Sequence, residues 1–165
     1  MYQLPPQVNT ALTLKPMTSE MYHAFFKEYQ NDTDLYLDKN DFVEYSYDKE
    51  KVDTYIQRQI DRKRLPFAIM LGNEIIGELK LYDIMEGQSA SLGITMKTKD
   101  YKDRGFGTQA ERLAVDYVFY TLDIPTLYAD SVLTNTRSQH VLEKVGFQFI
   151  YADDQRKHYR ITRND

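Results

Sequence analysis

The sequence predicts a single α/β (α+β) domain, residues 1–165, in which helices cover both faces of a mixed, mostly antiparallel central sheet. Apolar segments of strand length alternate along the chain with longer segments of helical periodicity. Some of the expected strands follow one another through short turns, whereas others are separated by a helix, so both antiparallel and parallel neighbours are expected. A chain of 165 residues is also long enough to bury a substantial core.

The expected elements follow in order from the N-terminus. Residues 11–15 alternate apolar and polar side chains and predict a strand, and Thr18 or Ser19 caps the helix that follows. A second helix starts near Lys51 and ends before Leu65-Pro66. Gly72-Asn73 predicts a hairpin turn, and Gly93 indicates a bulge or a close backbone approach. Further strands are expected at residues 67–71, 75–82, 89–96, 127–133, 147–152 and 159–162, with a loop at 83–88 and a short helix between residue 135 and Gly146.

The stretch 97–119 joins a glycine-containing loop to an amphipathic helix. Its apolar residues recur with helical spacing at Ala110, Leu113, Ala114, Tyr117 and Val118. Gly105 and Gly107 let the backbone approach an anion, and the first N–H groups of the helix have no partner within it. Lys102 and Arg104 add two cations. The loop therefore suits a phosphate group, although an ordinary strand-to-helix turn with solubilising charges has the same pattern.

Composition narrows the function classes. The chain has no cysteine, which excludes disulfides, a Cys-ligated metal and a cysteine nucleophile. A net charge of −4 and a pI near 5.4 argue against general nucleic-acid binding. No window approaches the ~20 apolar residues of a membrane span, and the first ten residues lack the features of a signal peptide. We expect a cytoplasmic protein that binds neither membranes nor nucleic acid.

Residues 31–50 are acidic and rich in aromatic side chains. Seven carboxylates stand against two lysines, with three tyrosines and a phenylalanine between them. Such a surface could receive a cationic amine through charge attraction and cation–π contact. A solvated, charge-rich connection is the alternative interpretation.

Three motifs in order resemble the GNAT superfamily of N-acetyltransferases, and within it the group of ribosomal-protein N-terminal and spermidine acetyltransferases. Lys102-Asp103-Arg104-Gly105-Phe106-Gly107 matches the acyl-CoA loop, Q/R-x-x-G-x-G/A, that opens a long helix. LGITM precedes it as the family's strand, and the N-x-x-S helix that ends in Gly-Phe follows as Asn135, Ser138 and Gly146-Phe147. Lys102 departs from the usual Gln or Arg, keeping the charge without the planar fork.

The resemblance implies a GNAT fold that binds acetyl-CoA as co-substrate, without a metal. The backbone from Asp103 to Thr108 would hold the pyrophosphate. The strands that contain residues 92–96 and 127–133 would splay apart, so that the pantetheine arm pairs with Ile94 and Met96. The backbone N–H of Thr95 or Met96 would polarise the thioester carbonyl. Asn135 would bind the pantetheine amides, although a helix cap explains it as well.

The catalytic residues are less well defined by the resemblance. Many relatives protonate the departing thiolate with a Tyr, but the aligned position is Leu142. We select Ser138 as the residue that takes the place of this Tyr. The alternative is a structural role, in which Ser138 is a residue of the helix start that bonds the backbone. Glu78 is the carboxylate best placed to act as a base through water. Relatives often have a Glu two residues before the Gly of the LGI strand, where this chain has Ser91.

We therefore expect an N-acetyltransferase acting directly on a primary amine: a protein N-terminus, a polyamine or a small amine, with a cationic amine preferred. The alternative is a catalytically silent acyl-CoA-binding or sensing module, which Leu142 and Ser91 keep open. Dimers are common among such relatives, so a homodimer stays open, although no apolar stripe in the sequence argues for one.

Overall fold

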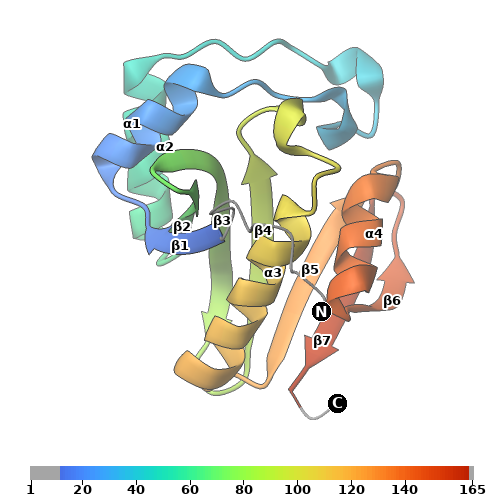
Figure 1. Ribbon diagram of the computed structural model, residues 1–165. Helices are drawn as coiled ribbons and strands as arrows, with labels where there is room; N and C mark the ends of the chain where they lie inside the picture. Colours follow the sequence, from blue (N-terminus) through green and yellow to red (C-terminus); the bar gives the residue numbers. More distant parts are fainter. Residues whose placement is uncertain (1–11, 164–165) are drawn as a thin grey trace, which may run out of the picture.

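The computed structural model describes residues 12–163, and these form one seven-stranded sheet with helices packed on both faces (Figure 1). Ala11 of the expected first strand lies outside the described residues. The elements are β1 (Leu12–Pro16), α1 (Ser19–Glu28), η1 (Thr33–Leu35), η2 (Lys39–Asp41), α2 (Lys49–Asp61), β2 (Leu65–Leu71), β3 (Glu74–Met85), β4 (Ser89–Met96), η3 (Lys99–Tyr101), α3 (Phe106–Asp116), η4 (Tyr117–Thr121), β5 (Thr126–Val132), α4 (Thr136–Val145), β6 (Gln148–Ala152) and β7 (Arg156–Thr162).

The sheet has the order β1-β2-β3-β4-β5-β7-β6, and β4 and β5 are its one parallel pair in the described chain. The parallel ladder is short. It joins Ser89–Leu92 to Thr126–Ala129 and stops there, so the C-terminal half of β4 has no partner on its β5 side. The predicted mixed, mostly antiparallel sheet and the predicted splay of these two strands are both confirmed.

Two clusters of apolar side chains hold the helices to opposite faces of the sheet. Successive residues of a strand point to opposite faces, so Ala68 and Met70 of β2 pack with α1 and α2, whereas Ile69 belongs to the cluster beneath α3. In Figure 1, α3 crosses in front of β4 and β5 with α4 beside it. The segment 29–48, between α1 and α2, runs across the top of the molecule toward the loop before α3.

Three local predictions differ from the structure. β3 continues to Met85, which pairs with Ser89, so the expected loop at 83–88 is shortened to residues 86–88. β7 begins at Arg156 rather than at Tyr159. Gly93 marks neither a bulge nor a close approach, because the register around it is regular and an added Cβ would meet no atom closer than 3.6 Å. The close approach occurs at Gly77, where a Cβ would lie 2.9 Å from the Thr95 carbonyl oxygen.

Helix α3 presents a different stripe to the sheet than its apolar residues alone predict. Ala110, Ala114 and Val118 are buried as expected, but Leu113 is 38% exposed. Glu111 takes its place at 1% exposure, on the same face as Ala114 and Val118. The helix then closes with a π turn, η4, before the chain enters β5.

None of the helices in residues 12–163 is long and apolar enough to cross a membrane.

Candidate active site

The N-terminus of α3 presents free backbone N–H groups to a cavity. Gly105 precedes the helix in the left-handed region, with φ +81°, and no side chain caps the helix start. The Gly105 carbonyl accepts the first intrahelical bond from the Gln109 N–H at 3.1 Å. The N–H groups of Phe106, Gly107 and Thr108 consequently have no partner within the helix, and together with the helix dipole they form an anion site.

The cations beside this anion site are Lys102 and Arg137, not the predicted pair Lys102 and Arg104. Arg104 is exposed and its guanidinium lies over the Phe106 ring, 4.8 Å from the centroid. Phe106 itself is 5% exposed and packs in the core beneath α3. Neither side chain lines the cavity, because the first turn of α3 directs Phe106 toward the sheet and Arg104 stays with its ring. If Arg104 and Phe106 contribute to coenzyme binding as predicted, they do so through their backbone atoms and not through their side chains.

Carboxylates of the 29–48 segment pair with both cations. Lys102 Nζ lies 3.2 Å from Asp32 Oδ2, and Arg137 Nη1 lies 3.3 Å from Asp34. Burial alone would raise the pKa of Asp32, but hydrogen bonds from the Asp34 backbone and from Lys102 outweigh it and hold that pKa below its usual value. Arg137 Nε lies 3.1 Å from Asp103 Oδ1, and its buried Nη1, although 3.3 Å from Asp34, has no acceptor at hydrogen-bond geometry. Nη1 is thus ion-paired with Asp34 without a hydrogen bond, and an incoming anion would have to compete with that carboxylate for it.

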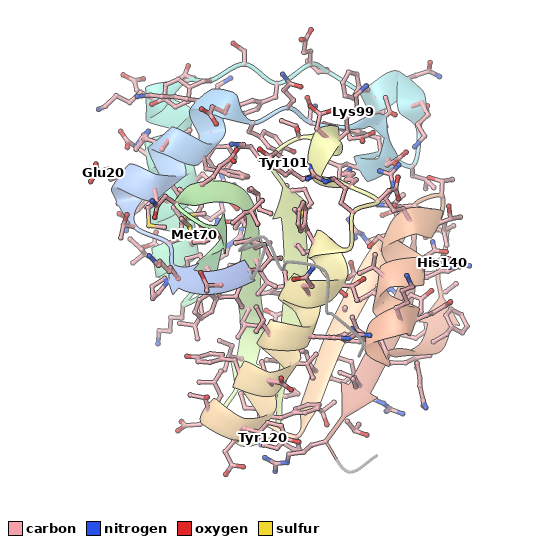
Figure 2. All side chains as sticks on the ribbon, in the orientation of Figure 1. Glu20, Met70, Lys99, Tyr101, Tyr120 and His140 are labelled. Carbon is pink, nitrogen blue, oxygen red and sulfur yellow. The ribbon has the colours of Figure 1, made fainter. Side chains whose placement is uncertain are left out.

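The cavity over the anion site measures about 840 Å³. Its walls come from the 29–48 segment, the loop before α3, the end of β4 and the start of α4. Figure 2 labels two of its lining residues, Tyr101 before α3 and His140 on α4. The predicted coenzyme residues found in this cavity are Ile94, Thr95, Met96, Lys102, Asp103, Gly105, Gly107, Thr108 and Asn135, together with Ser138.

A second cavity of about 470 Å³ opens where β4 and β5 separate. It shares Ile94, Thr95, Asn135 and Ser138 with the first cavity, so the two adjoin at the gap in the sheet. From the other side it is lined by Lys80 and Tyr82 of β3. A ligand held at α3 could thus be reached by a second molecule through this gap.

The direction of the backbone N–H groups on β4 decides which of them face the gap. The Lys97 N–H donates to the Ile76 carbonyl of β3 at 2.7 Å. Because successive residues of a strand direct their N–H groups to opposite sides, the Thr95 N–H also turns toward β3, whereas those of Ile94 and Met96 turn toward the gap. Of the two predicted carbonyl-polarising N–H groups, that of Met96 faces the gap and that of Thr95 faces β3.

Asn135 and Ser138 begin α4 at the junction of the two cavities. The Asn135 side-chain oxygen accepts from the Ser138 N–H at 3.1 Å and caps the helix. The Asn135 amide NH₂ remains a donor. The cap role is therefore present, and it leaves the amide group able to bind a ligand as well.

Glu78 does not reach the gap directly and lines none of the cavities described here. It is 4% exposed and accepts hydrogen bonds from the hydroxyl groups of Tyr22 and Tyr55, the latter at 2.8 Å. Lys80 Nζ lies 3.8 Å from it and donates to the Tyr55 hydroxyl at 2.9 Å. Tyr22 of α1 and Tyr55 of α2 enclose this carboxylate, which contacts Tyr55 and Lys80 instead of facing the cleft itself. Its predicted role as a base acting through water stays a prediction.

Sequence reasoning missed Arg137 and Glu111. Arg137 lies inside the Asn-x-x-Ser motif, where an unassigned cation next to a predicted anion loop was the available signal. Glu111 follows Ala110 on the helix that opens at the loop, and its place three residues before Ala114 and seven before Val118 put a carboxylate on the buried stripe.

No group of three or more His, Asp or Glu side chains within residues 12–163 is arranged to hold a metal ion.

The sheet opens between two parallel strands, beside an uncapped helix start with two cations, and this arrangement suits a long phosphate-bearing ligand. The domain family described as acetyltransferase (GNAT) matches residues 11–148, and the chain belongs to that family. A probable N-acetyltransferase of Bacillus subtilis, YjcK, is 30% identical over 112 residues, which span 66% of this chain and 61% of that protein. Spermidine N(1)-acetyltransferase of Escherichia coli is 28% identical over 106 residues, 64% of this chain and 54% of its own length. The chain thus matches little more than half the length of these curated relatives.

Among solved structures, spermidine N-acetyltransferase from Vibrio cholerae, in complex with CoA and spermine, superposes with a TM-score of 0.70. The superposition covers 94% of this chain and 98% of the Vibrio cholerae chain, at 18% sequence identity. This likeness establishes that the two proteins share a fold.

Proposed function

We propose that this chain is an acetyl-CoA-dependent N-acetyltransferase that transfers an acetyl group directly to a primary amine. The observation that carries the proposal is the junction of the two cavities at the gap between β4 and β5. A ligand anchored at α3 and an amine entering past β3 could meet there without a covalent enzyme intermediate.

The residues of the larger cavity fit coenzyme A. Its volume of about 840 Å³ suits a ligand of nucleotide-and-arm size. The uncapped N–H groups of α3 and the side chains of Lys102 and Arg137 suit a pyrophosphate. Along the gap, the unpaired edge of β4 suits an extended, amide-containing arm, with the N–H groups of Ile94 and Met96 and the Asn135 amide as donors.

When bound, acetyl-CoA supplies an activated acetyl thioester. The chain contributes position and charge: the α3 loop anchors the phosphates, and Met96 directs its N–H at the place where carbonyl charge develops. Ser138 faces the junction and would hydrogen-bond the departing sulfur. Lys102 and Arg137 would exchange Asp32 and Asp34 for phosphate oxygens.

The acceptor determines how much help with proton removal is needed. At pH 7, deprotonating a lysine-like or polyamine nitrogen costs about 4–5 kcal/mol, whereas an α-amine costs about 1 kcal/mol. In our proposal Lys80 lines the acceptor side, and burial lowers its pKa while Glu78 opposes that shift. Glu78 would therefore act at one remove, by setting the charge on Lys80, rather than as a base in contact with the amine.

The preference for a cationic amine now rests on a smaller part of the acidic segment. Asp32 and Asp34 are committed to Lys102 and Arg137. Asp48 and Glu50 line a cavity of about 540 Å³ with Phe26, Tyr45 and Tyr55, and Lys51 and Arg58 line it as well. In our proposal this cavity holds the distal charge of the amine, through carboxylate attraction and cation–π contact.

The test is thiol release from acetyl-CoA with a panel of peptide α-amines, polyamines, and small amines with and without a carboxylate. Acetylated product with at least one member supports the enzyme, and the ranking within the panel identifies the acceptor class. Tight coenzyme binding by calorimetry with no turnover on any amine would replace the proposal with the silent acyl-CoA-binding module.

A further inference from the structure

Glu111 is a buried carboxyl that the fold does not use. Its exposed fraction is 1%, and its Oε2 atom, fully buried, has no hydrogen-bond partner. Leaving a buried polar atom unpaired costs free energy that an alanine at this site would avoid. Glu111 lines both the coenzyme cavity and the cavity at the gap, at their junction with Asn135 and Ser138.

Its surroundings keep this carboxyl protonated at neutral pH. Burial raises the pKa of Glu111 to about 8, and no charged neighbour contributes to that shift. Of the elements packed against α3, β4 has no titratable side chain, β1 has only Lys15, and η4 has Tyr117 and Tyr120. Helix α4 carries Arg137, His140, Glu143 and Lys144, all but Glu143 lining the cavity. Across the gap, β3 and β5 contribute Lys80, Tyr82 and Asp130.

Apart from Glu111, the side chains that line both cavities, Leu35, Ile94, Thr95, Asn135 and Ser138, do not ionise near neutral pH, whereas His140, Lys80 and Tyr82 each line only one of the two cavities. Leu142 and Ala129 are apolar, and the Asn135 amide and Ser138 hydroxyl are hydrogen-bond donors that do not ionise near neutral pH. An unperturbed thiol has a pKa near 8.5, and proton transfer is most effective between groups of similar pKa at the working pH. Glu111 meets that condition.

We propose that Glu111 is the catalytic acid of this site and gives its proton to the sulfur that leaves when the acetyl group is transferred. This inference rests on the proposed function. The amine nitrogen forms its bond to the acetyl carbon while the carbon–sulfur bond breaks, and the electron pair of that bond goes to sulfur. Glu111 supplies the proton that completes the thiol. The amine loses one proton to water in the gap cavity, and Glu111 regains one from water there, so charge and protons balance.

The experiment compares wild type with Glu111→Gln, which keeps the size and polarity of the side chain but cannot act as an acid. Asp116→Asn, at an exposed carboxylate on the same helix, is the matched control. We expect Glu111→Gln to lower kcat by about 100-fold, with KM for acetyl-CoA within about threefold of wild type, and Asp116→Asn to match wild type. The wild-type rate should also fall as pH rises through about 8, where Glu111 loses its proton, and Glu111→Gln should lose that alkaline limb.

A second readout does not depend on turnover. Titration of coenzyme A at pH 8 in two buffers of different ionisation enthalpy measures proton uptake on binding. Bound coenzyme replaces the water of the cavities beside Glu111 and so disfavours its ionised form further, and wild type should therefore take up more protons than Glu111→Gln. Glu111→Leu, which places an apolar residue on the same buried stripe, should repeat both results.

Each outcome decides between the two proposals. If wild type turns over and Glu111→Gln and Glu111→Leu are equally active, Glu111 is not the acid and the acetyltransferase proposal stands. A loss of coenzyme affinity with kcat retained would assign Glu111 to binding and overturn the acid role. If wild type acetylates no amine in the panel, both proposals fall.

Discussion

Lys102 Nζ lies 3.2 Å from the Asp32 carboxylate, which precedes it by 70 positions in the chain. The contact joins the 29–48 segment to the anion-binding loop. Asp32 therefore already pairs with the lysine that would bind a phosphate, so a phosphate must compete with this carboxylate for Lys102.

Replacing Asp32 with Asn should strengthen coenzyme binding. The amide oxygen can still accept the Asp34 N–H that Asp32 holds at 3.1 Å, so the local turn is kept while the charge is removed. We expect the Kd for coenzyme A to fall by about tenfold, equivalent to ~1.4 kcal/mol, because a partly buried charge pair no longer has to be broken. Calorimetry measures this change. Asp41→Asn, an exposed carboxylate of the same segment, should leave the Kd unchanged, and weaker binding by Asp32→Asn would contradict the competition.

Gly105→Val should abolish coenzyme binding at moderate cost to the fold. No protein atom lies within 4 Å of a Cβ added at Gly105, so the side chain would extend into the space of the ligand. The φ of +81° adds backbone strain of about 1–2 kcal/mol.

Gly87→Val is the matched control for that strain. Gly87 has φ +70° and equally open surroundings, but lies in the turn between β3 and β4. Both variants should melt at similarly lowered temperatures, and only Gly105→Val should lose affinity by at least about 100-fold. Retained calorimetric affinity in Gly105→Val would remove the loop from the coenzyme site.

The stability of the protein should depend on the protonation of Glu111. Its pKa is about 8 when folded against 4.5 in an open chain, so between these values the folded state binds more protons than the unfolded state. The stabilising protonated form is complete below pH 4.5 and is lost as pH rises through 8.

Glu111→Gln should remove that dependence. The difference in unfolding free energy between this variant and wild type should increase by roughly 4 kcal/mol from pH 4.5 to pH 9, in favour of the variant. Urea denaturation at several pH values measures it, with Asp116→Asn as the reference. Parallel pH curves for wild type and Glu111→Gln would show that the carboxyl is ionised in the folded protein.

Glu78→Gln should act mainly on stability. Its carboxylate accepts from Tyr22 and Tyr55 and lies beside Lys80, so losing the charge leaves the lysine without its partner. We expect the free energy of unfolding to fall by about 3 kcal/mol. Glu86→Gln, at an exposed site in the adjacent turn, is the control. Unchanged stability would contradict the structural role of this buried carboxylate.

Ser138→Ala should lower turnover and spare coenzyme affinity. The backbone N–H that bonds Asn135 is unaffected by the change, so the helix cap survives. Kinetics with saturating acetyl-CoA, alongside calorimetry, separate the two quantities, and an unaltered kcat would exclude the hydroxyl from the reaction.

Local signals predict the path of the chain well and the choice of side-chain partners poorly. The order of strands and helices, the Gly72-Asn73 turn and the glycine-opened helix each follow from a few neighbouring residues. The burial of Glu78 depends on α1 and α2 meeting over β3, and the approach of Arg137 to Asp34 joins segments about 100 positions apart. Leu113 and Glu111 differ by two positions on one helix, and only the packing of α3 on the sheet decides which is buried.

The short ladder between β4 and β5 divides the sheet into two blocks, one of four strands and one of three, that are joined through four residue pairs. An extended ligand arm in the gap would act as an added strand segment that completes the seam between these blocks. Bound coenzyme would then stabilise the contact between the two blocks, and with it the whole sheet. Hydrogen exchange of the Ile94 and Met96 amides should therefore slow on coenzyme binding, together with amide exchange in both blocks.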